Sequence, residues 1–351
     1  MTERPLIGDP IQTGGPSKAP AIVLIGCGAI AESFHLQALT RLEDIKGKMV
    51  LVDLDHARVQ EVAGRYGIGQ FRSDYRSVIE NVDGAIVATP ARTHFPIALD
   101  FLKAGVHVLC EKPLAESANQ VTQLLEAADR SGVSISVNNT RRLFPVTREI
   151  RSWMQQGKLG RVQSIEFHLG EKFDWPSAGD SYFGVRGSGR GVLSDIGAHV
   201  IDLVCWWLGG LPRITKYQDD FMGGTEAVAR LGLEHEGCNV DIHLSWLSKL
   251  ENVYRVRGNA GTIEGEIHDH RSFSFIRPSG ERRIIRAGRG PATYSGFATV
   301  LLENFVEVIN GKATPMISAG DVLPSIALID ECYGRRSRFQ MPWFEPGGGM
   351  Q

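Results

Sequence analysis

The sequence contains no long hydrophobic run: no segment has the roughly 20 apolar residues that a membrane-spanning helix needs. It also lacks an excess of positive charge, because it contains 38 Lys and Arg residues and 40 Asp and Glu residues. This balance predicts no nucleic-acid or membrane-surface partner. The five cysteines form no Cys-x-x-Cys pair, and their odd number argues against a secreted disulfide framework. We therefore expect reduced, mostly buried thiols.

The two ends of the sequence show few structural signals. Residues 1–20 mix Pro, Gly and charged residues without the apolar core of a signal peptide, which predicts a flexible arm. Residues 336–351 predict a similarly loose tail. From these features we expect a cytoplasmic protein.

The chain is long enough for two domains, because its 351 residues exceed the roughly 250–300 at which single cores stop growing. In residues 21–142, strand-like runs alternate with amphipathic helical segments. This alternation predicts an α/β fold with a doubly wound parallel sheet, a Rossmann dinucleotide-binding domain. Residues 143–335 predict an α+β domain for substrate binding and oligomerisation, with an open, mainly antiparallel sheet. Its last helices are candidates for packing back on the first domain.

A glycine turn after the first strand-like run favours a bound dinucleotide. The segment AIVLIGCGAIA fits a Gly-x-Gly-x-x-Ala fingerprint, in which Gly26 permits the tight turn and Gly28 lets the backbone approach a pyrophosphate. Ala29 and Ile30 then begin a helix whose N–H groups can bind phosphate oxygens. An ordinary glycine turn is the alternative, but the preceding strand and following helix favour the cofactor.

Asp53 ends the second strand-like run, about 25 residues after Gly28. A carboxylate there can accept both ribose hydroxyls of NAD and would repel a 2′-phosphate. Leu54 and Asp55 follow, and neither could bind that phosphate. The sequence therefore predicts NAD in preference to NADP.

Two other segments carry side chains suited to catalysis. On a helix beginning near Asp195, the 100° rotation per residue places Asp195, His199 and Asp202 in one sector. A solvated helix edge is the simpler explanation of that stripe, and a metal site is a third one that no other His/Cys cluster supports. Glu111 and Lys112 fall at the end of a predicted strand, where a doubly wound sheet binds its cofactor, so both are candidates for cofactor binding. Lys112 is either aimed into the cofactor crevice or an ordinary surface lysine.

These motifs together resemble the glucose-fructose oxidoreductase/inositol dehydrogenase (Gfo/Idh/MocA) family of sugar oxidoreductases. The resemblance rests on GCGAIA, Asp53, ATPARTH, EKP and GVLSDIGAHVIDLVCWWLG, and it extends from about residue 21 to 334. It implies a Rossmann domain followed by a domain whose open sheet commonly mediates oligomerisation, and hence a homodimer or homotetramer. It also implies a catalytic set made up of Lys112, Asp195 and His199. The residues that it implies near the nicotinamide are Thr89, Pro90 and His94.

Oxidation of a secondary alcohol requires such groups. An imidazole, with an ordinary pKa of roughly 6.5, can accept the hydroxyl proton, which suits His199. Lys112 can stabilise negative charge on the substrate oxygen, and Asp195 can orient a hydroxyl or tune the imidazole. We therefore predict an NAD-dependent dehydrogenase or ketoreductase acting on a sugar, cyclic polyol or derivative. A redox glycoside hydrolase that retains its cofactor is the second hypothesis, and a non-enzymatic dinucleotide sensor is the third.

Several residues are weaker candidates for substrate binding. Arg190 replaces part of the glycine run that family members often carry, and together with Arg141, Arg142 and Arg186 it could form a cationic ring. Guanidinium groups suit carboxylate or phosphate, so an acidic or nucleotide-linked sugar is one hypothesis; salt bridges within the fold are the other.

Aromatic and histidine side chains in two loops complete the set of candidates. Trp175 and Tyr182 could pack on a pyranose ring, although loop aromatics more often anchor the loop to the core. His268 and His270 occur in one short tract, which cannot complete a coordination sphere. We expect no metal.

Overall fold

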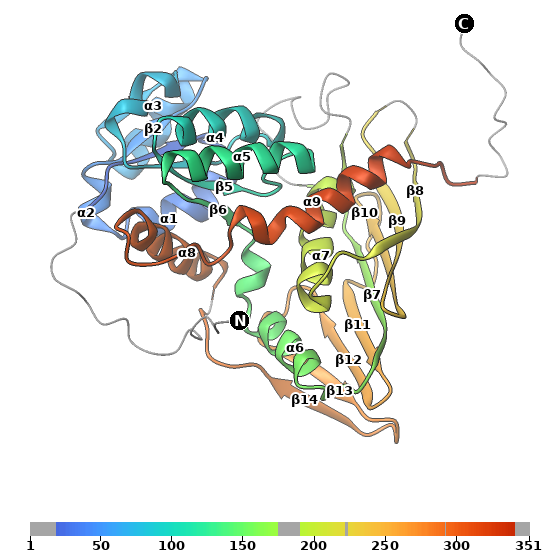
Figure 1. Ribbon diagram of the computed structural model, residues 1–351. Coiled ribbons are helices and arrows are strands. Elements are labelled where there is room, and N and C mark those ends of the chain that lie inside the picture. The colour runs from blue at the N-terminus through green and yellow to red at the C-terminus, as the bar shows by residue number, and fades with distance from the viewer. Residues whose placement is uncertain (1–18, 175–189, 222–223, 292, 341–351) are drawn as a thin grey trace, which may run out of the picture.

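The computed structural model describes residues 19–174, 190–221, 224–291 and 293–340, and within these ranges the chain forms two sheets (Figure 1). Sheet A is parallel throughout, with strand order β3-β2-β1-β4-β5-β6. Its strands are β1 (Ile22–Ile25), β2 (Val50–Val52), β3 (Gln70–Arg72), β4 (Gly84–Val87), β5 (His107–Glu111) and β6 (Ile135–Asn138).

Helices cover sheet A, whose central strands β1 and β4 are buried, as parallel strands covered on both faces must be. Short polar residues and glycines end these helices: the Asp55 side chain accepts from the N–H of Arg58 at the start of α3, and Gly67 ends α3 in a left-handed conformation. The helical segments are η1 (Ala31–His35), α1 (Leu36–Leu39), α2 (Glu43–Lys46), α3 (His56–Tyr66), η2 (Tyr75–Asn81), η3 (Ala91–Thr93), α4 (His94–Lys103) and α5 (Ala118–Ser131).

Sheet B is mixed and mainly antiparallel, with order β14-β13-β12-β11-β7-β10-β9-β8 and one parallel pair, β7 with β10. Buried and exposed residues alternate along β10, so one face of the sheet is packed and the other is accessible. The strands are β7 (Val162–Gly170), β8 (Arg213–Asp219), β9 (Val228–His235), β10 (Cys238–Ser245), β11 (Val253–Gly258), β12 (Gly261–Glu266), β13 (Ser272–Ile276) and β14 (Arg282–Arg286).

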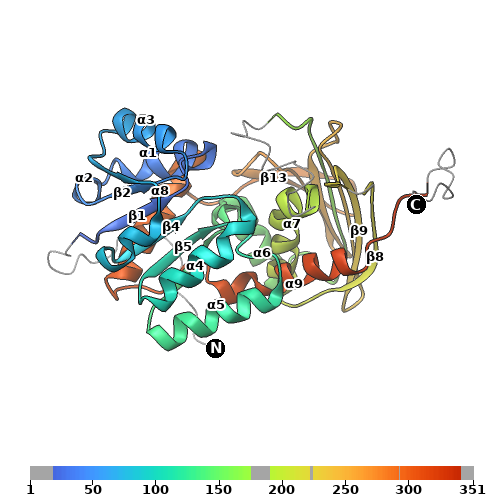
Figure 2. The same ribbon diagram turned by 90° about the horizontal axis from the view of Figure 1, so that it is seen from above.

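The remaining helices lie beside or between the two sheets, and the view from above shows α9 running from beside α5 toward β8 (Figure 2). Helix α7 packs on β7, β9 and β10, while α9 contacts both α7 and α5. Helix α8 returns to the N-terminal half and packs on η1 and α1. These remaining helical segments are η4 (Thr140–Leu143), α6 (Pro145–Gln155), α7 (Val192–Leu208), α8 (Tyr294–Ile309) and α9 (Ala319–Gly334).

The predicted fold class is confirmed: a parallel Rossmann-type sheet precedes a mainly antiparallel one. The predicted boundary at residue 142 stays a prediction. All five cysteines are buried and unpaired. None of the helices in the described ranges has the length and apolarity required to cross a lipid bilayer.

Candidate active site

The glycine turn lies between β1 and η1, beside the point where the strand order of sheet A reverses from β1 to β4. Gly26 has φ +94°, and a Cβ there would lie 2.5 Å from the carbonyl oxygen of Ala88, so only glycine fits. At Gly28, no described atom lies within 4 Å of an added Cβ. A dinucleotide therefore has room to approach the backbone at the position where this fold class binds its ligands.

Asp53 fixes this turn as well as ending β2. Its Oδ2 accepts a hydrogen bond from the backbone N–H of Cys27 at 2.8 Å, and its Oδ1 accepts from the N–H of Asp55 at 3.0 Å. Each carboxylate oxygen has a second lone pair, and the residue is partly exposed, so ribose hydroxyls can still bind. Glu32, which begins the next helix, is ion-paired with Arg58 and Arg65, and this neutralises a carboxylate that would otherwise repel phosphate.

Thr89, Pro90 and His94 follow β4, but the imidazole of His94 faces the interior. It is 1% exposed, with Nε2 2.7 Å from the carbonyl oxygen of Thr89 and Nδ1 2.7 Å from that of Pro113. Both ring nitrogens are thus occupied within the fold. We interpret His94 as a brace between the segment after β4 and the turn that carries Lys112.

Glu111 also faces the interior. One carboxylate oxygen lies 2.7 Å from Nε2 of His35 and accepts from the Asn138 amide. Burial alone would raise the pKa of Glu111, but His35, Asn138 and Lys112 lower it below its usual value. No sequence motif singled out His35, which is fully buried in η1 directly after the glycine turn. The pair connects the start of the cofactor-binding segment to the end of β5.

Lys112 and Asp195 meet, although they are 83 residues apart. The Lys112 ammonium donates to Oδ1 of Asp195 at 2.6 Å, and both side chains are mostly buried, with 18% and 23% exposed. Lys112 follows β5 of sheet A, whereas Asp195 lies in the first turn of α7. The N-terminal and C-terminal halves of the chain therefore form one site.

His199 lies one turn further along α7 on the same face. Its Nδ1 is buried and has no hydrogen-bond partner among the described residues. Burial, together with the positive charges of Lys112 and Arg141, lowers the pKa of His199 well below its ordinary value. The imidazole is therefore neutral near pH 7 and can accept a proton.

The start of α7 is held by Glu226, a residue that no sequence motif singled out. Its carboxylate accepts hydrogen bonds from the backbone N–H groups of Gly191, at 2.9 Å, and Leu193, at 3.2 Å. Glu226 is 0% exposed and also binds Tyr333 and Arg336. This supplies an N-terminal cap from a distant segment and fixes the turn that carries Asp195.

Two of the predicted substrate-binding arginines are engaged within the fold. Arg142 donates twice to Asp202, at 2.7 Å each, and also to the carbonyl oxygen of Asp321. Asp202 therefore faces this buried pair, although the helical stripe grouped it with Asp195 and His199. Arg190 binds the carbonyl oxygen of Glu116 and the Asp330 carboxylate, and it stacks on Tyr333. Their donors are largely used, which favours the salt-bridge interpretation for both.

Other candidates contribute little to the site. Trp175, Tyr182 and Arg186 lie outside the described residues. His268 faces Glu171 at 3.3 Å, and His270 packs on Phe297. In the described ranges, no group of His, Cys, Asp and Glu side chains has an arrangement that could hold a metal ion.

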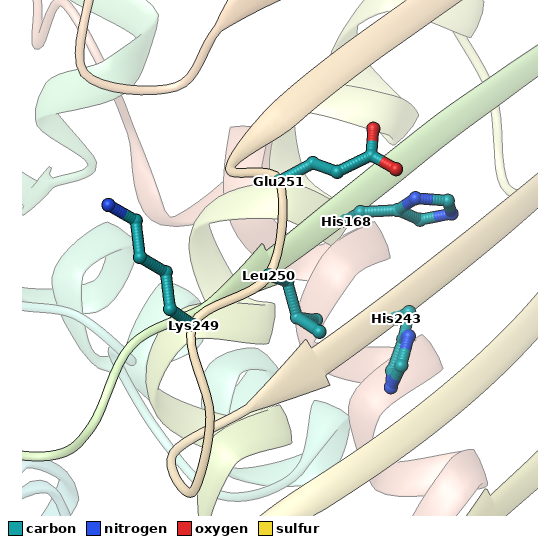
Figure 3. A pocket seen from close by; sticks show the side chains of 5 residues that line it. All are labelled: His168, His243, Lys249, Leu250 and Glu251. Carbon is teal, nitrogen blue, oxygen red and sulfur yellow. The ribbon is translucent and has the colours of Figure 1, made fainter.

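A hollow of about 570 Å³ on sheet B lies apart from this site (Figure 3). His168 on β7 and its neighbour Phe167 point to opposite faces of the sheet. Phe167 stacks on Trp207 of α7, with ring centroids 5.8 Å apart. The hollow is therefore on the face turned away from α7; its lining residues are His168, His243, Lys249, Leu250 and Glu251.

Comparison with known families agrees with this arrangement. Residues 21–139 match the model described as "Oxidoreductase family, NAD-binding Rossmann fold", and residues 147–264 match the GFO/IDH/MocA C-terminal domain. The chain belongs to the Gfo/Idh/MocA family. The resemblance inferred from the sequence motifs is thereby confirmed, and the N-terminal sheet is that family's NAD-binding domain.

Curated members of the family are distant in sequence. Oxidoreductase P35 of Formosa agariphila is 28% identical over 55% of this chain and 62% of its own length. Levoglucosan dehydrogenase of Pseudarthrobacter phenanthrenivorans is 31% identical over 65% of this chain and 61% of its own length. The chain thus spans about three fifths of these two relatives. D-apiose dehydrogenase of Paraburkholderia graminis is 24% identical over 88% of this chain and 86% of its own length.

Solved structures share the fold over most of the chain. KijD10, a 3-ketoreductase from Actinomadura kijaniata solved with NADP and TDP-benzene, has a TM-score of 0.79 at 21% identity, covering 92% of this chain and 99% of its own. The WlbA dehydrogenase from Bordetella pertussis, solved with NADH and UDP-GlcNAcA, has a TM-score of 0.74 at 19% identity, covering 89% and 94%.

Proposed function

We propose that this protein is an NAD-dependent oxidoreductase that interconverts a secondary alcohol and a ketone on a sugar, cyclic polyol or sugar derivative. The observation that carries the proposal is the 2.6 Å contact between Lys112 and Asp195, with a neutral His199 one turn further along α7. These groups lie beyond the carboxyl end of β5, on the side of the sheet where a Rossmann domain binds its cofactor. Bound nicotinamide supplies the chemistry of accepting or giving the hydride.

Each of the three side chains has a role in handling the substrate hydroxyl. His199 takes the hydroxyl proton during oxidation and returns it during reduction. Lys112 donates a hydrogen bond to the same oxygen and stabilises negative charge that develops there. Asp195 holds the Lys112 ammonium and can accept from a neighbouring hydroxyl. A sensor would have no need of this acid–base set.

The residues of the glycine turn support NAD as the cofactor. Gly26, Gly28, Ala29 and Ile30 present the backbone to the pyrophosphate, and Asp53 accepts the ribose hydroxyls. Arg58, the nearest cation of α3, already contacts Glu32 and the carbonyl oxygen of Cys27. The 2′-phosphate of NADP would be repelled by the Asp53 carboxylate, and Arg58 is not available to bind it. NAD is therefore preferred to NADP.

The exposed face of sheet B supports a homodimer or homotetramer. Strand β10 presents Asn239 and Asp241 on this face, and Arg255 pairs across it with Glu264 at 2.9 Å. An accessible sheet face of this width can pair with a second copy, which would not obstruct the site between sheet A and α7.

The full chain should be assayed with NAD⁺, and in parallel NADP⁺, against polyols, aldoses, uronic acids and sugar nucleotides. We expect NADH to accumulate with at least one sugar or polyol, and NAD⁺ to be the better cofactor. His199→Asn should slow turnover by about 10²- to 10⁴-fold, whereas the exposed His268→Asn should not. Absence of NADH with every compound, or a fully active His199→Asn enzyme, would overturn the proposal. Product formed from a glycoside with retained cofactor would instead indicate the hydrolase.

A further inference from the structure

Arg141 has a guanidinium nitrogen that the described part of the chain leaves without a hydrogen bond. It lies in η4, three residues after β6, and its Nη1 is buried without a hydrogen-bond partner in the ranges that the structure describes. A guanidinium nitrogen buried without a partner is costly, because it has lost its water and has no hydrogen bond in exchange. Such a group is expected to have a ligand.

The neighbouring charges are already paired with one another. Lys112 is paired with Asp195, and Arg142 with Asp202. Arg141, which is adjacent to Arg142 in the sequence, lies close enough to Asp195 to interact with its carboxylate. Its positive charge also lowers the pKa of His199. Arg141 is therefore the cation of the site whose Nη1 has no partner among the described residues, and oxidised nicotinamide would add a second positive charge.

We propose that Arg141 binds a carboxylate of the substrate, so that the sugar or polyol oxidised by this enzyme is an acid such as a uronate or aldonate. This inference rests on the proposed function and specifies its substrate class. A planar guanidinium binds a carboxylate through two parallel hydrogen bonds and so fixes the orientation of the molecule that carries it. Orientation is what a site needs when several hydroxyls of one sugar could react.

The number of available guanidinium groups favours a carboxylate over a nucleotide diphosphate. One guanidinium with an unpartnered nitrogen can bind one carboxylate, whereas a pyrophosphate carries at least two negative charges and needs further cations. The other arginines of the predicted ring that the structure describes, Arg142 and Arg190, are committed to Asp202 and to Asp330. Tyr294, at the start of α8, also lies near Arg141 and hydrogen-bonds with Thr140, so this side of the site has a neutral polar group. The other cation near Tyr294 is Lys112, which is paired with Asp195.

The test compares matched acidic and neutral substrates on the NAD⁺-loaded full chain. Hexuronates and aldonates would be assayed beside the corresponding aldoses, polyols and uronamides, with wild type, Arg141→Gln, Arg141→Lys and the control Arg283→Gln. Arg283 is an exposed residue of β14 that pairs with Glu281. Titration of the NADH complex with the same acids, followed by nicotinamide fluorescence, measures binding independently of turnover.

We expect wild type to prefer an acid over its neutral counterpart by roughly 10-fold or more in kcat/KM, since charged hydrogen bonds contribute at this level. Arg141→Gln should lose about 10- to 100-fold on the acid and less than about 3-fold on the neutral sugar. Arg141→Lys should be intermediate, because it keeps the charge but not the paired donors, and Arg283→Gln should match wild type. The Arg141→Gln protein should be at least as thermally stable as wild type, because the substitution removes an unpaired buried charge.

Each alternative result is decisive. Turnover of neutral sugars with no preference for acids would overturn the carboxylate inference and leave the proposed function standing. A loss of stability in Arg141→Gln, with equal losses on both substrate classes, would show Arg141 to be structural. If no compound turned over, the proposed function would fail, and the fluorescence titration would decide Arg141: acid binding that Arg141→Gln abolishes supports the inference, and no acid binding overturns it.

Discussion

The neutral state of His199 is a property of its surroundings. Burial disfavours the imidazolium, and Lys112 and Arg141 oppose it further, so the pKa is well below the ordinary value. Only the unprotonated form can accept the hydroxyl proton, so oxidation should remain fast as the pH falls below about 6.5. Removing a nearby cation raises the pKa of His199, and Arg141→Gln should therefore move the acid limb of kcat/KM to higher pH.

The measurement is kcat/KM between pH 4.5 and 8 with a neutral substrate. A neutral substrate has no carboxylate to lose its contact with Arg141, so the profile reports only the pKa of His199. Arg283→Gln should reproduce the wild-type profile. An acid limb that stays in place in Arg141→Gln, or moves to lower pH, would contradict an electrostatic effect of Arg141 on the catalytic imidazole.

Sequence reasoning at the residue level identified types and faces of side chains but not their partners. Helical periodicity placed Asp195 and His199 together, and the EKP turn singled out Lys112. The same periodicity included Asp202, which turns out to pair with Arg142, 60 residues away. His94 and Glu111 were predicted near the cofactor but bind Pro113 and His35 inside the fold. No local pattern encodes such contacts, because they exist only after the elements pack.

Helix α7 depends on an acceptor from another element. No side-chain cap of its own precedes Val192, and the Glu226 carboxylate takes the hydrogen bonds of the first turn instead. Glu226→Gln should keep the shape but lose the charge that faces Arg336 and the helix N-terminus. We expect a loss of about 1–3 kcal/mol in unfolding free energy, measured by urea denaturation. The hydrogen bonds to the first turn of α7 and to Arg336 lose their charged acceptor, although Arg336 keeps its ion pair with Asp219.

The same substitution should lower kcat/KM, since Asp195 lies in the turn that Glu226 caps. Glu303→Gln, an exposed change on α8, is the matched control and should leave both quantities unchanged. An unaltered stability in Glu226→Gln would mean that water or the backbone caps α7 equally well.

The order of helices and strands along the chain could be predicted from the sequence better than the pairing of the strands. Alternating strands and helices predicted sheet A, because parallel strands require helical crossovers. The parallel pair of β7 with β10 in sheet B was not predicted. The two strands are separated in sequence by α7, β8 and β9, so no local pattern relates them, and both pack on α7.

At the scale of the whole molecule, the active site exists only where the two halves meet, and Arg190 joins the segments that frame it. It connects the start of α7 to Glu116, after the Lys112 turn, and to Asp330 on α9, with its guanidinium 4.7 Å from the Tyr333 ring centroid. Arg190→Met should cost about 2–3 kcal/mol, since two charged hydrogen bonds and a cation–π contact are lost.

That loss should lower Tm by several degrees, as seen by calorimetry. It should reduce kcat through displacement of α7 relative to Lys112, while the substrate KM changes little. Arg190→Lys should recover part of the stability, because the ammonium can still reach Asp330. The opposite pattern, a raised KM with unchanged Tm, would contradict this prediction. It would show that Arg190 binds the substrate and that other contacts join the two halves of the chain.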